Sequence, residues 1–256
     1  MSIDWNAIAQ QDDHRPWPTP SRRWVMTMSW VDLLFAHWPV DPAKLEPHIP
    51  EGLTLDLYEG EAWVSLVPFE MDNTMVRGLT WWPRPMQFAE LNLRTYVTAQ
   101  GETSDKPGVW FFSLDAASRL AVAGARASFH LPYFNAKMSI ERDGEWLEYD
   151  SRRTHRGEPP VEFSGRYRPA GPIEKAEVGS LDHWLFERYC LYSADSSGTV
   201  YRADVNHAPW PLRPVEVDID QNTIGEPVGI EMAGRPPRMQ FVDQLDVVGW
   251  LPEKLA

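Results

Sequence analysis

The sequence predicts a single β-rich domain, a barrel or a sandwich, with a few short helices. Short runs in which apolar and polar residues alternate recur along the 256 residues. The 23 prolines and 16 glycines are scattered, which is typical of many short elements. Long amphipathic helical patterns do not occur, so we do not expect a parallel α/β sheet.

We expect an extended N-terminal arm over residues 1–23, which are polar and proline-rich, ahead of one domain over 24–256. Short helices are predicted after Asp41, over 116–124 and after Ser180. The segment 125–134 is predicted as a strand that places Arg126, Ser128 and His130 on one face. The other expected strands lie near 24–35, 53–57, 62–69, 89–97, 108–116, 137–149 (a hairpin), 162–168, 190–193, 199–206, 214–220 and 239–250.

Composition excludes several classes of protein. With 24 basic and 37 acidic residues, the net charge of −13 argues against a general phosphate-backbone binder, although one local basic patch stays possible. The single cysteine, Cys190, permits no intrachain disulfide. The seven histidines are dispersed and no cofactor motif is present, so we expect no metal and no cofactor. Without a signal-peptide pattern or a long apolar run, we expect a soluble, cytoplasmic protein with no membrane partner.

Three neighbouring predicted strands each carry polar residues on one face. Glu90, Asn92, Arg94 and Tyr96 alternate with apolar residues, and so do Ser113 with Asp115 and Arg126 with His130. These side chains either face water or line a pocket inside the barrel. Inside a pocket the charges would need partners, and guanidinium groups could hold an anionic or carbonyl-bearing ligand.

Several segments resemble the YqjF-like family of uncharacterised bacterial proteins, in the same order along the chain. They span residues 37–69, 90–97, 107–116, 125–138, 185–193 and 205–212. That family is grouped with the acetoacetate decarboxylase-like fold. The resemblance therefore implies a closed, cone-shaped β-barrel with a central small-molecule cavity.

The resemblance breaks at the decarboxylase nucleophile. Those enzymes carry a Gly-aromatic-Pro-Lys-Lys motif in which one lysine forms a Schiff base, and acetoacetate decarboxylase is a standard example of such an activated lysine. The similar segment here is 130–134, which places Tyr133 and Phe134 at the positions of the lysine pair. Glu90 is similar to the active-site glutamate of that fold. Lys137, four residues after Tyr133, shares its strand face if no bulge intervenes.

Three hypotheses follow. The first is a barrel pocket for a small carboxylate- or carbonyl-bearing molecule, with proton carriers Glu90 or His130 and ligand-binding residues Arg94, Asp115, Arg126 and Tyr133. If it is an enzyme, we expect a lyase-like or proton-transfer activity on a small oxo- or carboxylic acid. The second is a Schiff-base lyase that uses Lys137. The third is an interaction protein that docks through Trp81, Trp82 and the arm. Barrels of the acetoacetate decarboxylase-like superfamily commonly self-associate, so the resemblance also implies a homodimer.

Overall fold

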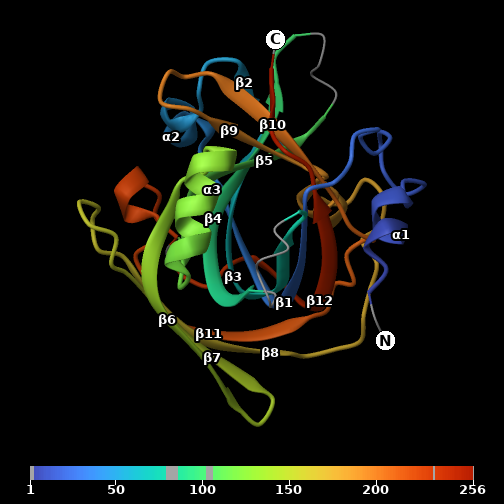
Figure 1. Cartoon of the computed structure of the whole chain (residues 1–256). Coiled ribbons are helices and arrows are strands. Elements are labelled where there is room, and N and C mark those ends of the chain that lie inside the picture. Colours follow the sequence, from blue (N-terminus) through green and yellow to red (C-terminus); the bar gives the residue numbers. More distant parts are fainter. Residues whose placement is uncertain (1–2, 79–85, 102–105, 233, 256) are drawn as a thin grey trace.

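Among the described residues, seven strands close into a ring. The structure, a computed structural model, describes residues 3–78, 86–101, 106–232 and 234–255 (Figure 1). The strands, in ring order, are β1 (Met26–Val40), β3 (Ala62–Val76), β4 (Met86–Ala99), β5 (Gly108–Ala116), β9 (Cys190–Ala194), β10 (Val200–Asn206) and β12 (Arg238–Gly249). The ring closes because β12 pairs with β1 while β4 pairs with β5. The closed, β-rich fold predicted from the sequence is therefore confirmed.

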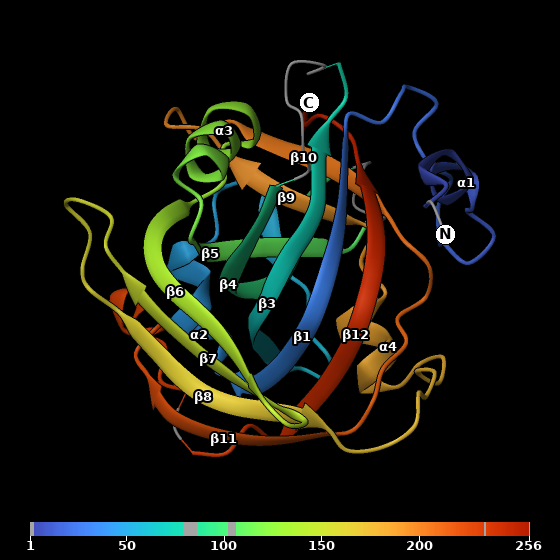
Figure 2. The same ribbon diagram turned by 60° about the horizontal axis from the view of Figure 1, so that its bottom comes forward.

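A second group of strands continues from β5 and curves beside the ring (Figure 2). It consists of β6 (Tyr133–Asp143), β7 (Trp146–Arg153), β8 (Glu162–Pro169) and β11 (Val215–Asn222). The short β2 (Leu53–Leu55) pairs with β4, and β13 (Glu253–Lys254) pairs with β10. The helices are α1 (Trp5–Gln10), α2 (Pro42–Leu45), α3 (Arg119–Phe129) and α4 (Leu181–Phe186), with 3-10 turns η1 (Glu46–His48) and η2 (Glu226–Val228).

The two faces of the ring strands bury separate apolar clusters. Phe35, Val67 and Phe111 belong to the cluster inside the ring. Leu34 and Leu91 point the other way, into the cluster between the ring and the curved sheet. Because successive side chains of a strand point to opposite faces, one run of sequence serves both cores.

The structure corrects the prediction of a strand over 125–134. The helix α3 runs from Arg119 to Phe129, with Ser118 as its N-cap. An apolar stripe that includes Val122 and Phe129 packs on the ring interior. The helix ends at His130, whose φ of 54° is left-handed and stops the helical path. Arg126 and Ser128 therefore lie on a helix, and they share no strand face with His130.

A β-bulge in β5 reverses which of its residues face the ring interior. Leu93 pairs with Ser113, but Arg94 pairs with Phe111, so Phe112 is the inserted residue. Before the bulge Phe111 faces inward, and after it Leu114 does. The predicted alternation along 108–116 is broken at this point.

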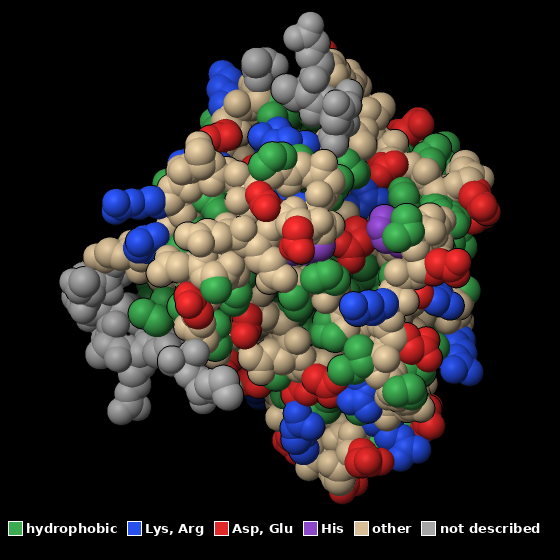
Figure 3. Space-filling view, turned by 90° about the vertical axis from the view of Figure 1, so that its right-hand side faces the viewer, with side chains coloured by type: hydrophobic (Ala, Val, Ile, Leu, Met, Phe, Trp, Pro, Cys, Tyr) green, Lys and Arg blue, Asp and Glu red, His purple; other side chains and the backbone are tan. Residues whose placement is uncertain are grey.

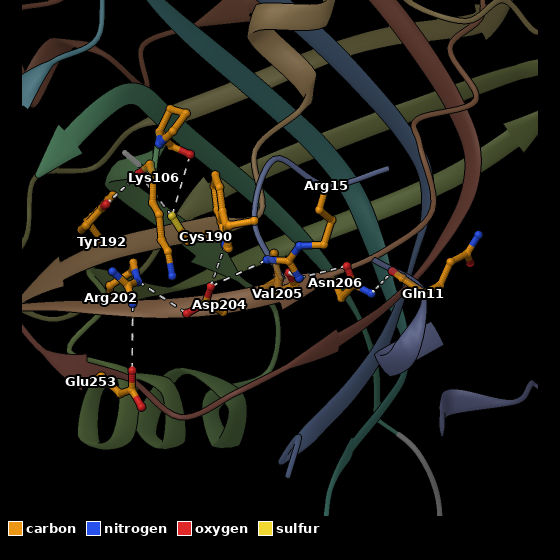
Figure 4. A network of polar contacts seen from close by, with 12 residues as sticks. Gln11, Arg15, Lys106, Cys190, Tyr192, Arg202, Asp204, Val205, Asn206 and Glu253 are labelled. Carbon is orange, nitrogen blue, oxygen red and sulfur yellow. Dashed lines mark hydrogen bonds and ion pairs between the residues drawn. The ribbon is translucent and has the colours of Figure 1, made fainter. Parts of the chain in front are cut away.

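The N-terminal arm docks on β10 and contains α1, so it is not extended throughout (Figure 4). Arg15 donates to the carbonyl oxygen of Val205 at 3.1 Å and to Oδ1 of Asn206 at 3.0 Å. Its guanidinium also lies 3.7 Å from the carboxylate of Asp204. Asn206 in turn donates to the carbonyl oxygen of Gln11 at 2.9 Å. Polar contacts of buried groups thus hold the arm against the ring.

Acidic and basic side chains are interspersed over the side of the molecule on which α1 lies (Figure 3). No helix within the described ranges has the length and apolar character needed to cross a membrane.

Candidate functional site

The ring encloses a cavity of about 600 Å³. That volume falls in the range of pockets that take drug-sized ligands, roughly 300–1,000 Å³. We call the end of the cavity that is lined by buried side chains the floor, which consists of Phe35, Arg94, Phe186, Arg188 and Trp210. We call the end whose lining includes exposed side chains the mouth, which consists of Met26, Met75, Val76, Met86, Leu120 and Leu251.

The strand β4 runs along the cavity wall from mouth to floor. Met86, Phe88, Glu90, Asn92 and Arg94 all line the cavity. This is the polar face that the sequence pattern singled out, and its apolar opposite face is buried in the outer cluster. A strand that is polar on one side can line a cavity because its other side still packs in a core.

Glu90 and Tyr133 form a buried pair on the wall. The hydroxyl of Tyr133 donates to Oε2 of Glu90 at 2.8 Å. Burial raises the pKa of Glu90 to about 8, an effect that the Tyr133 hydrogen bond opposes and the charge of Asp115 reinforces. A carboxyl group with a pKa near neutrality can give up and take back a proton, which suits general acid–base chemistry.

Arg94 places a positive charge at the floor. Its side chain is only 9% exposed, and among the described residues no carboxylate pairs with it. Its Nε is fully buried without a hydrogen-bond partner, and its guanidinium lies 5.3 Å above the ring of Phe35. Burial lowers the pKa of Arg94 from its ordinary value, the interaction with the Tyr96 hydroxyl opposes that change, and the like charge of Arg188 adds to it. An arginine stays charged even so, and an isolated buried charge is costly.

The neighbouring Arg188 differs from Arg94 because it has an anionic partner. Its guanidinium pairs with the carboxylate of Asp56, and its Nε donates to the carbonyl oxygen of Trp184 at 2.7 Å. Asp56 compensates the charge of Arg188, so the positive charge at the floor that no carboxylate compensates among the described residues is that of Arg94. An anion would satisfy it.

Sequence reasoning missed several polar groups near the floor. His37, Ser65 and Tyr96 form a buried chain in which consecutive hydrogen-bonding atoms are 2.6 Å apart. His207 and Trp210 line the cavity, and each has a ring nitrogen that is buried without a partner. Tyr96 belongs to the polar face that the alternation along β4 already marks. The other residues come from three separate stretches of chain, so no local spacing in the sequence marks them.

Asp115 does not line the cavity. Its carboxylate accepts two hydrogen bonds from Arg153, from Nε at 2.7 Å and from Nη2 at 2.8 Å. Burial raises the pKa of Asp115, and the contacts with Arg153 oppose that rise. Asp115 follows the bulge in β5, which turns it away from Glu90 and Arg94. Its charge is already satisfied by Arg153.

Arg126, His130 and Lys137 also lie outside the cavity lining. Arg126, on α3, donates to the carbonyl oxygen of Tyr133 at 2.8 Å and so helps to position that residue. The ring of His130 lies 4.7 Å from that of Tyr201. Lys137 is exposed and pairs across the strands with Arg152 of β7. It lies about 13 Å further along β6 than Tyr133, beyond the ring.

The chain's five lysines all fall in the described residues, and none lines the cavity. Within the described ranges, no group of three or more histidine, cysteine, aspartate or glutamate side chains is arranged to hold a metal ion. Trp81 and Trp82, which the sequence suggested as docking residues, lie outside the described residues.

Solved structures with the same architecture are acetoacetate decarboxylase-like proteins. The acetoacetate decarboxylase of Legionella pneumophila matches with a TM-score of 0.57 at 12% identity, over 100% of this chain and 97% of that one. The enduracididine biosynthesis enzyme MppR, in complex with pyruvate, matches with a TM-score of 0.61 at 10% identity, over 95% of this chain and 97% of that one. At these identities the match shows a shared fold.

Sequence comparison gives the family. Residues 27–246 match the model of the DUF2071 family, described as "Uncharacterized conserved protein (COG2071)". Over 231 residues the chain is 44% identical to "Uncharacterized protein YqjF" of Bacillus subtilis (strain 168), which covers 90% of this chain and 93% of the relative. The chain belongs to the DUF2071 family, and the resemblance to YqjF-like proteins inferred from its motifs is confirmed.

Proposed function

We propose that the protein binds a small carboxylate-bearing molecule in the ring cavity, with the carboxylate on Arg94. The observation that carries the proposal is the uncompensated guanidinium of Arg94 at the floor of an otherwise largely apolar cavity. A carboxylate would supply the missing partner, and guanidinium–carboxylate hydrogen bonds are among the stronger ones in proteins. MppR, which shares the fold, has been solved with the small oxo acid pyruvate.

We further propose that Glu90 and Tyr133 act on the bound molecule as a proton-exchanging pair. Because the pKa of Glu90 is about 8, its carboxyl group is mostly protonated at neutral pH. In that form it can donate a hydrogen bond or a proton to a carbonyl oxygen or an enolate carbon. Tyr133 holds the carboxyl group in place through its hydroxyl.

The other two hypotheses have less support. A Schiff-base lyase needs a desolvated lysine, but Lys137 is exposed and outside the cavity lining. A pure interaction protein would be favoured by a filled ring interior, whereas the interior holds a cavity of about 600 Å³.

A thermal-shift panel tests the proposed function. Small monocarboxylates and their primary amides are compared on the wild type, on Arg94→Met and on Arg152→Gln, a control at an arginine that lies on β7 outside the cavity lining. We expect acids, but not amides, to raise the melting temperature of the wild type and of Arg152→Gln. Arg94→Met should show no acid-dependent shift. Equal shifts in the wild type and Arg94→Met would overturn the proposal.

A further inference from the structure

The positions of polar and apolar groups along the cavity carry information about the shape of the ligand. Arg94 lies at the floor, and β4 extends from it to Met86 at the mouth. At roughly 3.3 Å per residue, this wall is about 26 Å long. A short acid on Arg94 would therefore leave most of the cavity empty.

The walls above the floor are mainly apolar. Phe69 and Phe88 line the middle of the cavity, and five methionines line its upper part: Met26, Met28, Met71, Met75 and Met86. Methionine side chains are flexible and polarizable, so they adapt to apolar ligands of varied shape.

Apolar character continues onto the surface around the mouth. Met75 is 46% exposed, Leu120 52% and Leu251 48%, and Val76 lies beside them. Large apolar side chains at the entrance of a cavity favour entry of an apolar molecule.

We propose that the ligand is an elongated apolar monocarboxylate, with its carboxylate on Arg94 and its tail extending toward Met26 and Met86. This inference rests on the proposed function, since it takes the carboxylate contact with Arg94 as given. In this orientation Glu90 and Tyr133 lie beside the body of the ligand, because the Cα atoms of Glu90 and Arg94 are about 13 Å apart along β4.

Gly124 of α3 offers a precise way to shorten the cavity. It lines the cavity, and a Cβ atom placed there meets no heavy atom within 4 Å. Because glycine is unfavourable inside a helix, Gly124→Ala and Gly124→Leu are expected to fold. The leucine would occupy space that the tail of a long acid needs, while the alanine adds only one methyl group.

The experiment measures dissociation constants for straight-chain saturated acids from butyrate to decanoate at pH 7, by titration calorimetry. In the wild type we expect affinity to rise about three- to fourfold for each added methylene until the cavity is filled. Gly124→Leu should weaken decanoate binding by about tenfold or more and leave butyrate unchanged. Gly124→Ala should behave nearly as the wild type.

The outcomes separate the two proposals. If acids bind through Arg94 but affinity does not depend on chain length, or Gly124→Leu weakens short and long acids alike, the elongated ligand is wrong and the proposed function stands. If Arg77→Gln at the cavity rim abolishes binding while Arg94→Met does not, the proposed orientation is wrong. If none of the acids binds to the wild type, both proposals fail.

Discussion

The hydroxyl of Tyr133 lies 2.8 Å from Oε2 of Glu90, and both side chains are buried at the cavity wall. The Arg126 side chain donates to the carbonyl oxygen of Tyr133 at 2.8 Å, which helps to hold this residue at the wall. The close contact of a carboxyl group and a phenol is the geometry on which the proposed proton exchange rests.

The first prediction concerns the pH dependence of stability. The pKa of Glu90 is about 8 in the folded protein, above its ordinary value of 4.5. Between these values the folded state binds a proton that the unfolded chain has lost, so this contribution to stability falls as pH rises toward 8. Glu90→Gln removes this contribution. In denaturant unfolding from pH 5 to 9, the free energy of unfolding of the variant should rise relative to that of the wild type by up to about 1.4 kcal/mol per pH unit. Parallel curves of unfolding free energy against pH would contradict the raised pKa of Glu90.

The second prediction concerns the cost of keeping Arg94. A buried charge without an anionic partner destabilises the ligand-free protein, so Arg94→Met should be as stable as the wild type or more stable by up to about 3 kcal/mol. Urea unfolding of both proteins without added ligand measures this difference. A loss of more than about 2 kcal/mol would mean that the guanidinium already has a satisfied structural role.

The third prediction is the opposite result for Arg153. Because Arg153 satisfies both oxygens of Asp115, Arg153→Met leaves a buried carboxylate unpaired. We expect a loss of about 3–5 kcal/mol in urea unfolding. The double variant Arg153→Met with Asp115→Leu should recover most of the stability. If the double variant is no more stable than the single one, the pair is not the reason for the loss.

The fourth prediction separates the two candidate proton carriers. His130 caps α3 in a left-handed conformation, outside the cavity lining. Asparagine tolerates that conformation, so His130→Asn should fold and bind acids as the wild type does. If this variant has unchanged stability but shows no acid-induced thermal shift, His130 takes part in acid binding.

The fifth prediction concerns Lys137. Borohydride treatment in the presence of a panel of β-oxo acids, followed by peptide mapping, should give no adduct at this residue, because it is exposed and lies beyond the ring. A specific adduct at Lys137 that a competing carboxylate prevents would support the Schiff-base hypothesis instead.

The sequence predicted the cavity face of β4 because strand alternation is a local property. Glu90 and Arg94 keep the parity of their strand, and the apolar residues between them fill the outer core. Asp115 was placed wrongly in the pocket because one inserted residue, Phe112, reverses parity without any distinctive sequence signal.

The helix α3 could have been predicted in full. Ser118 is a good N-cap, and Ala121, Val122, Ala125 and Phe129 follow at helical spacing. The alternation of Arg126, Ser128 and His130 suggested a strand over the same residues. The lack of a carboxylate partner for Arg94 among the described residues could not be predicted, because it depends on which carboxylates the folded ring brings near the floor.

The most direct test of the account is a crystal structure of the protein with the tightest-binding acid of the chain-length series. We predict carboxylate oxygens about 2.7–2.9 Å from the terminal guanidinium nitrogens of Arg94. The apolar tail should run along the wall beside Glu90 and Tyr133, in the direction of the methionines of the mouth. A carboxylate at the mouth beside Arg77, or an acid bound outside the ring, would contradict the account.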